Sequence, residues 1–263
     1  MKRITFILVL LMFLFCGCQN FRDTSVITEP TEPLPTEPVT TEPATEPVTL
    51  PQETEPAYSS LCIPDLPVED VIGYFNEVVL SAEFSNAGDP SKVQKWDTEI
   101  VYIIYGDMTE EDRQVLDTFT RWLNDIQGFP GIRETAVDAE ANLRIYFCTY
   151  EKLLEILGND FQGVDGGVTF WYSDDRIYDG KICIRTDLNQ DLRNSVILEE
   201  IYNGLGPVQD TDLRQDSIIY SGFSAPQSLT AVDELILKLL YHPDIACGMD
   251  AARCESVIRE LYR

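Results

Sequence analysis

Residues 197–209, ILEEIYNGLGPVQ, place several side chains that could do chemistry on one predicted helix. Glu199 and Asn203 are four residues apart, which puts them on the same side of a helix. Glu200 adjoins Glu199, so the two carboxylates diverge by about 100° and are not a ready-made acid–base pair. Oxygen atoms from Glu199 and Asn203, together with Gln209 or Asp210, could form a weak site for a hard cation such as Ca²⁺. The alternative is structural: Glu199 and Asn203 satisfy each other as polar groups of the helix.

The same segment resembles the active-site helix of metzincin-like zinc proteases, whose pattern is H-E-x-x-H-x-x-G-x-x-H. The histidine positions fall on Glu199, Asn203 and Gln209. The resemblance implies that Glu200 stands where the general base would be, and Gly206 where the turn glycine would be. A zinc site of this type needs two imidazoles one helical turn apart, and the whole chain has one histidine. A zinc peptidase with histidine ligands is therefore excluded, and we expect no metal or other cofactor unless the weak Ca²⁺ site forms.

A closer resemblance is to DUF2927, a bacterial family of unknown function. It is carried by E-E-x-x-Q-x-L-G-L-x-N-D at 199–210, D-S-I-x-Y at 216–220, L-T-x-x-D at 229–233 and L-L-Y-x-P-x-x-x-x-G-M at 239–249. The chain departs from the family pattern at Asn203, usually Gln, and at Gln209, usually Asn, and both remain amides. The 216–220 segment is also similar to the matrixin Met-turn, with Ile219 where methionine would stand. The resemblance implies a zincin-like fold over about 68–261 and no assigned activity.

Residues 1–17 have the pattern of a secretory signal. Lys2 and Arg3 precede an apolar run that is short for a transmembrane helix. The run ends in FCGC at 15–18, which resembles a bacterial lipobox with Cys18 as the acylated residue, although Phe15 and Cys16 are unusual at their positions. We expect an extracytoplasmic lipoprotein that Cys18 anchors to the cell membrane or cell surface. A plain secreted or membrane-anchored protein is the alternative.

Residues 18–57 form the expected linker, in which Thr-Glu-Pro occurs six times. Repeated proline blocks helix and sheet, and the glutamates repel one another, so we expect a disordered, extended spacer. The remaining residues, 58–263, are numerous enough for one domain with its own core.

The charge of the chain limits its partners. With 45 acidic and 19 basic residues, the formal net charge is −26. We therefore expect no nucleic-acid partner, and membrane contact through the lipid anchor only.

The cysteines of the domain do not define a disulfide framework. Their number is odd, so at least one is free or pairs between chains, and a bridge between Cys247 and Cys254 is one option. The pairing stays open for all of them: Cys62, Cys148, Cys183, Cys247 and Cys254.

Hydrophobic periodicity and capping signals predict an α+β domain. Capping motifs open helices at Thr109 and at Thr230. The order of elements resembles the zincin fold, in which a small twisted sheet and an edge strand above a cleft precede the active-site helix. Helices are expected at 68–82, 109–128, 151–157, 189–205, 230–241 and 250–262, and strands at 99–105, 142–148, 166–172 and 181–185.

The function that we favour is binding by a zinc-free, non-catalytic, protease-like domain. Its ligand would be an extracellular peptide, a protein or a cell-envelope component, held in a cleft above Glu200 and open at the edge strand. Candidate residues of the cleft are Trp171, Tyr172 and Tyr220.

Two other functions stay open. In one, the domain is a hydrolase with altered chemistry, in which Glu200 acts as the base with help from Glu199, Asn203, Asp210 or Tyr220. In the other, the chain is a structural envelope lipoprotein without a specific ligand.

Overall fold

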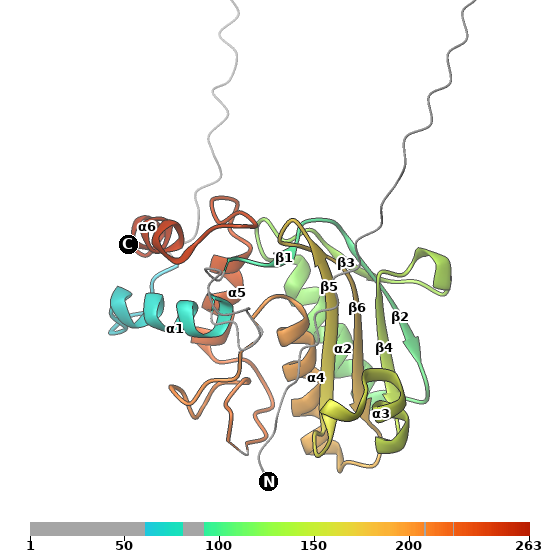
Figure 1. The fold of residues 1–263 in the computed structure, drawn as a ribbon. Coiled ribbons are helices and arrows are strands. Elements are labelled where there is room, and N and C mark those ends of the chain that lie inside the picture. The colour runs from blue at the N-terminus through green and yellow to red at the C-terminus, as the bar shows by residue number, and fades with distance from the viewer. Residues whose placement is uncertain (1–60, 81–91, 208, 223) are drawn as a thin grey trace, which may run out of the picture. The chain divides into compact units, whose positions relative to one another are not determined.

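The structure, a computed structural model, describes residues 61–80, 92–207, 209–222 and 224–263. The predicted signal, Cys18 and the predicted linker lie outside the described residues. The described part is α+β, with six α-helices and a small, mostly parallel sheet of six strands (Figure 1). None of its helices has the length and apolar character that a membrane span requires.

The predicted helices and the four predicted strands are all present, with ends shifted by a few residues. Strand β6 is longer than expected. Two further short strands, β1 and β3, were not predicted, because they have too few residues to show an alternation of apolar and polar side chains. The helices are α1 (Val68–Leu80), α2 (Glu110–Asn124), α3 (Tyr150–Leu157), α4 (Gln190–Gly204), α5 (Ala231–Leu240) and α6 (Ala251–Leu261), with short 3₁₀ turns at Asp138–Glu140 and Asn159–Phe161. The strands are β1 (Lys95–Trp96), β2 (Ile100–Tyr105), β3 (Ile132–Glu134), β4 (Leu143–Cys148), β5 (Gly166–Ser173) and β6 (Arg176–Arg185).

The sheet has the order β1-β6-β4-β2-β3, and β5 pairs with β6. All pairs are parallel except β5 with β6. The chain reverses between these two strands at Asp174 and Asp175, whose φ angles are 51° and 62°. Two successive residues with positive φ are typical of the tight turn of a β-hairpin. Among the described strands β5 pairs with β6 alone, so it is an edge strand, as the sequence predicts.

Helix α4 is the centre of the domain. It packs on β5 and β6 and against α2, while α3 lies on the other face of the sheet (Figure 1). Every residue of α4 from Arg193 to Gly204 is buried. A helix that is covered on all sides needs no polar face, which explains why α4 mixes apolar and polar residues without a strong helical period.

The start of α4 is fixed by a buried ion pair with α2. Asn189 caps the helix by accepting a hydrogen bond from the Leu192 backbone N–H at 3.0 Å. Arg193 Nε then donates to Asp112 Oδ1 at 2.8 Å, with both side chains buried. Burial alone would raise the pKa of Asp112, but the hydrogen bond from Arg193 and those from Thr109 outweigh it and the pKa is lowered. Asp112 also closes the capping box of α2, so one carboxylate sets the position of two helices.

A buried hydrogen-bond network joins α1, the 216–220 segment and α5. Tyr74 Oη donates to Ser217 Oγ at 2.8 Å, and Ser217 Oγ donates to Asp233 Oδ1 at 2.6 Å. The other oxygen of Asp233 accepts from the Thr230 backbone N–H at 2.8 Å, which completes the capping box of α5. The D-S-I and L-T-x-x-D motifs therefore have a structural role here, because their polar side chains satisfy one another in the core.

Candidate functional site

Three sides of α4 are identified by the contacts of its residues. Glu200 faces the sheet, where a Cβ added to Gly166 of β5 would stand 2.7 Å from Glu200 Cγ. Asn194 faces α2, since its amide donates to Glu111 Oε1 at 2.8 Å. Tyr202 faces α5, where its hydroxyl donates to the Asp233 backbone oxygen at 3.0 Å.

Ser195, Glu199 and Asn203 form a row of polar residues that runs obliquely along α4, from beside Tyr202 toward the side of Glu200. Around the helix axis Glu199 lies about 100° from Glu200, and Asn203 about 60°. We call this row the α4 polar stripe. All three residues are buried, with exposed fractions of 0% for Ser195, 3% for Glu199 and 0% for Asn203.

Asn203 is the unusual member of the stripe. Within the described part of the chain, neither its Oδ1 nor its Nδ2 has a hydrogen-bond partner, and the same holds for Ser195 Oγ. A buried amide without partners costs about 1–3 kcal/mol, so such groups point to water or a ligand. The interpretation that Asn203 and Glu199 satisfy each other is wrong. The spacing puts both on one side of the helix, but no hydrogen bond joins the Asn203 amide to Glu199.

The predicted Ca²⁺ site draws on amide as well as carboxylate oxygens, and it stays a prediction. The described residues contain no group of three or more His, Cys, Asp or Glu side chains placed to hold a metal ion. Gln209 follows the helix in a turn, where its backbone N–H donates to the Val78 oxygen at 3.4 Å. Asp210 is half-buried beside it.

Gly206 makes the turn after α4 possible. Its φ is +127°, and a Cβ would stand 2.6 Å from the Gln94 backbone oxygen. The end of the helix is held on both sides of this turn, because Trp96 Nε1 donates to the Gly204 oxygen at 2.9 Å and Tyr241 Oη donates to the Leu205 oxygen at 2.8 Å. Only glycine combines this backbone angle with this close approach.

The aromatic residues predicted for the cleft have different neighbours. Trp171 lies under Lys181, whose Nζ is 5.5 Å from the ring centroid. Tyr172 packs on Phe170 with ring centroids 6.5 Å apart and on the main core. Tyr220 lies in a separate segment, next to Thr211, with which it forms an isolated bridge. Trp171 and Tyr172 lie on β5, and the cleft that these two residues and Tyr220 would line stays a prediction.

The edge of β5 has a defined hydrogen-bonding direction. The Gly180 N–H of β6 donates to Asn142 on the β4 side, whereas the Arg185 N–H donates to Asp165 on the β5 side. Phe170 pairs with Gly180, so its backbone N–H and C=O point away from β6, to the outer edge. Exposure rises along the strand, from 2% at Phe170 to half-buried Trp171 and Tyr172 and exposed Ser173.

Within the described residues Cys148, Cys183, Cys247 and Cys254 are free thiols, so the bridge between Cys247 and Cys254 is not formed. Cys148 and Cys183 are neighbours on β4 and β6. A hydrogen bond from Cys183 lowers the pKa of Cys148, and the same bond, followed by burial, raises the pKa of Cys183. Cys254 is fully buried in the main core.

Two features of the site were missed by sequence reasoning. Ser195 extends the α4 polar stripe, and its spacing of four from Glu199 is a signal that could have found it. Lys95 is buried, and its Nζ donates to the Leu240 backbone oxygen at 2.6 Å. No local sequence pattern predicts that Lys95 is buried, because its hydrogen-bond partners are backbone atoms about 145 residues away in the sequence.

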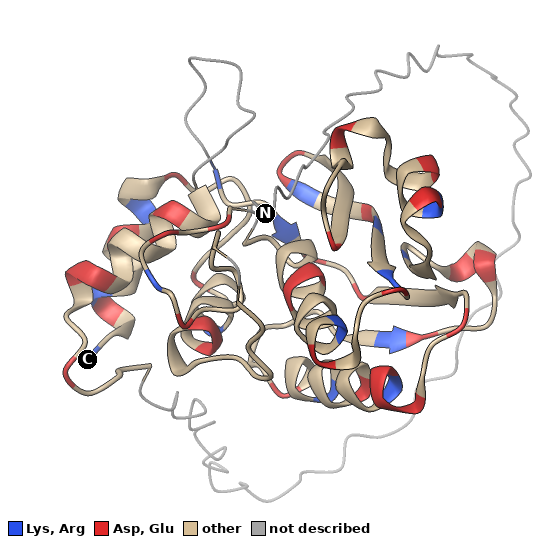
Figure 2. Cartoon of the chain, turned by 90° about the horizontal axis from the view of Figure 1, so that it is seen from below, with Lys and Arg blue, Asp and Glu red and all other residues tan. Residues whose placement is uncertain are grey.

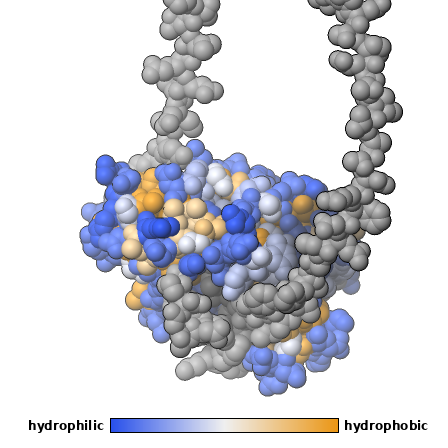
Figure 3. All heavy atoms as spheres, turned by 45° about the horizontal axis from the view of Figure 1, so that its top comes forward, coloured by the Kyte–Doolittle hydropathy of each residue, from blue (hydrophilic) through white to orange (hydrophobic). Residues whose placement is uncertain are grey.

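The surface of the described domain is mostly hydrophilic. Acidic side chains outnumber basic ones and are spread over the helices rather than gathered at one place (Figure 2). A space-filling view shows apolar side chains exposed among hydrophilic ones on the side that carries α1 and α6 (Figure 3).

The fold and the site define an α+β domain with a buried central helix, a polar row on that helix and an antiparallel edge strand beside it. The profile of the family described as "Protein of unknown function (DUF2927)" matches residues 69–260. The chain therefore belongs to the DUF2927 family, as the motifs indicate. None of the curated proteins matches the sequence.

Proposed function

We propose that this domain is a zinc-free, zincin-like binding domain, displayed outside a bacterial cell by a lipid on Cys18. It binds an extended peptide along the edge strand β5, and the α4 polar stripe, which is buried in this structure, opens to the peptide on binding. Asn203 carries the proposal. Its amide is buried and lacks hydrogen-bond partners among the described residues. A peptide backbone supplies both the donor and the acceptor that an amide side chain requires.

The zincin-like part of the proposal is supported by the order and direction of the elements. A mostly parallel sheet ends in the antiparallel edge strand β5, and α4 packs against that strand. Glu199 and Asn203 stand at the positions of the two helix histidines, and Gly206 turns the chain directly after the helix.

We propose that the peptide pairs with the edge strand β5. The outward-facing backbone groups of Phe170 and the exposed end at Ser173 suit the addition of one strand to the sheet. Trp171 and Tyr172 would add side-chain contacts at the same end. A cell-envelope ligand with amide groups offers similar chemistry, and the peptide is the simplest form of it.

We propose that binding, rather than catalysis, is the role of the site. Glu200 stands at the position of the general base, but its side chain packs against Gly166 and Val196 lies beside it. It is thus directed to the sheet, about 100° around the helix axis from Glu199 and about 60° from Asn203.

Selection from a displayed library of random peptides, with the purified full chain as the target, tests the proposal. We expect enriched peptides whose affinity falls about tenfold or more in Asn203→Leu, which corresponds to about 1.4 kcal/mol. Asn159→Leu, at an exposed residue of a 3₁₀ turn, is the matched control and should bind like the wild type. Peptides that bind equally to the Asn203→Leu variant would contradict the assignment of the stripe.

Mass spectrometry of the selected peptides tests the non-catalytic role. We expect them to be recovered intact. If the wild type cleaves the peptides and Glu200→Gln does not, the domain is a hydrolase and not a binding domain.

The anchor is tested separately, in cells. We expect the wild type to incorporate labelled palmitate and to enter the detergent phase on phase separation, and Cys18→Ser to do neither. An unlabelled wild-type chain would show that the protein is secreted without a lipid.

A further inference from the structure

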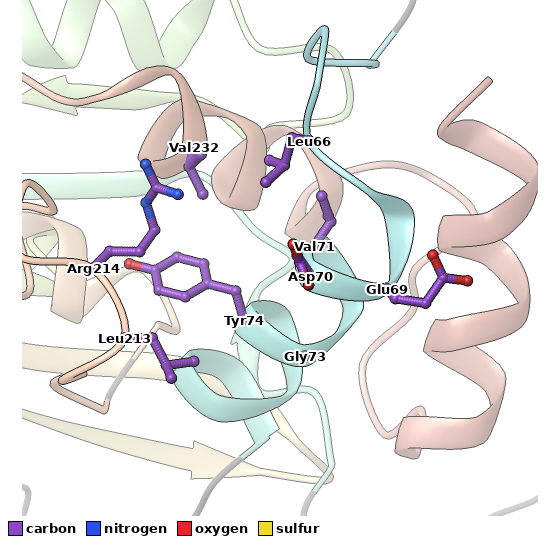
Figure 4. Close-up of a pocket in the computed structure, with 9 residues that line it drawn as sticks. All are labelled: Leu66, Glu69, Asp70, Val71, Gly73, Tyr74, Leu213, Arg214 and Val232. Atoms are coloured by element: carbon purple, nitrogen blue, oxygen red, sulfur yellow. The ribbon is translucent and has the colours of Figure 1, made fainter.

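A pocket of about 320 Å³ lies between α1, α5 and the segment that contains Leu213 and Arg214 (Figure 4). This volume is at the small end of the range for small-molecule sites, about 300–1,000 Å³. None of the residues of the α4 polar stripe lines it. The lining residues are Leu66, Glu69, Asp70, Val71, Gly73, Tyr74, Leu213, Arg214 and Val232.

Gly73 is a glycine that the fold does not require. It lies inside α1, its φ is not positive, and an added Cβ would meet no atom within 4 Å. Glycine in the middle of a helix is destabilising relative to alanine, because it loses more conformational freedom on folding. Since no close approach explains the residue, we infer that its contribution is the open space of the pocket.

Arg214 supplies a positive charge at one end of the pocket. Its Nη2 donates to Asp216 at 3.1 Å, while its buried Nε has no hydrogen-bond partner among the described residues. Figure 4 shows its side chain beside the hydroxyl of Tyr74. The planar fork of a guanidinium has the geometry to hold a carboxylate with two parallel hydrogen bonds.

Asp70 supplies a negative charge to the same pocket. Within the described part of the chain its carboxylate makes no ion pair and no hydrogen bond, unlike the neighbouring Glu69, which turns to Arg259 at 2.9 Å. In Figure 4 Glu69 points away from the pocket, toward α6. Asp70 can therefore receive the cationic group of a ligand.

The remaining wall is apolar. Leu66, Val71 and Val232 line it, and Leu213 stands at the rim with 61% of its surface exposed. A ligand with a short apolar chain would cover Leu213 and remove apolar surface from water.

We propose that this pocket binds a small zwitterion with an apolar side chain, that is, a free apolar amino acid. Arg214 holds its carboxylate, Asp70 holds its ammonium group, and Leu66, Val71 and Val232 contact its side chain. A ligand that carries both charges is net neutral, so the strongly acidic chain does not repel it as it would a simple anion. The site is separate from the peptide site proposed above and does not depend on it.

Three probes separate the contributions of the two charges. L-leucine carries both, N-acetyl-L-leucine only the carboxylate and L-leucinamide only the ammonium group. Titration calorimetry with the purified full chain should show binding of L-leucine, and binding weaker by about tenfold or more for each analogue.

Variants assign each charge to its residue. Arg214→Gln should remove the preference for L-leucine over L-leucinamide, and Asp70→Asn should remove the preference over N-acetyl-L-leucine. Gly73→Leu should fill the pocket and abolish binding of all three probes. Arg253→Gln, on the separate helix α6, is the matched control and should leave all three affinities unchanged.

Absence of L-leucine binding at millimolar concentration would overturn the proposal, and so would equal affinity for L-leucine and L-leucinamide. If Gly73→Leu fails to fold, Arg214→Gln and Asp70→Asn still test the proposal. Both variants should fold, because both side chains are at least partly exposed and neither is in the core.

Discussion

The side chain of Glu200 lies directly against Gly166, so closely that a Cβ at position 166 would stand 2.7 Å from Glu200 Cγ and 2.5 Å from Val196 Cγ1. The carboxylate at the position of a protease's general base is thus packed under the first residue of the edge strand. This contact fixes the distance between α4 and β5. It also fixes the direction in which the neighbouring polar stripe points.

Gly166→Ala tests this contact. The added methyl group would overlap two buried side chains of α4, so we expect the free energy of unfolding to fall by about 1–3 kcal/mol. Chemical denaturation measures it. The double variant Gly166→Ala/Val196→Ala should recover part of the loss, since it removes the nearer of the two contacts. Stability equal to that of the wild type would mean that α4 and β5 are not packed as described.

Gly73→Ala should have the opposite effect. A Cβ at this helical position meets no atom within 4 Å, so alanine gains the helix propensity that glycine lacks. We expect the free energy of unfolding to rise by about 0.5–1 kcal/mol, measured in the same denaturation experiment. A loss of stability would show that the pocket beside α1 is not open.

Ser217→Ala should disrupt the network that joins α1 to α5. The substitution leaves the Tyr74 hydroxyl without its acceptor and removes one donor to Asp233, both in the core. We expect a loss of about 1–3 kcal/mol in the free energy of unfolding. Ser173→Ala, at the exposed end of β5, is the control and should change the stability little. An equal effect of the two substitutions would speak against the network.

Lys95 should make the stability depend on pH. Burial lowers its pKa from 10.5 to about 8. Between these two values the unfolded chain holds a proton that the folded protein lacks, so the free energy of unfolding should rise with pH across this window, by at most about 3 kcal/mol. Thiols and tyrosines also titrate there, and comparison with Lys95→Met removes their effect. Denaturation at a series of pH values should show the rise in the wild type relative to Lys95→Met, and parallel curves would contradict it.

The sequence by itself determined the helices, the longer strands and the family. Local signals suffice for these, because a capping box such as Thr109 with Asp112, or Thr230 with Asp233, connects residues only three apart. The family motifs are also local strings, and they identify the chain without any knowledge of how the strings meet. The count of histidines excluded a zinc site with two histidine ligands from this chain in the same way.

Only the tertiary structure decided what those residues do. Nothing in the sequence connects Tyr74 with Ser217, residues 143 positions apart, and the spacing of Glu199 and Asn203 allows them to be partners of each other. The structure buries Asn203 and leaves its amide without a described partner. It also brings Asp70 and Arg214 to one pocket. The physical reason is that burial and side-chain direction depend on which elements pack against a helix, and this packing joins residues from distant parts of the chain.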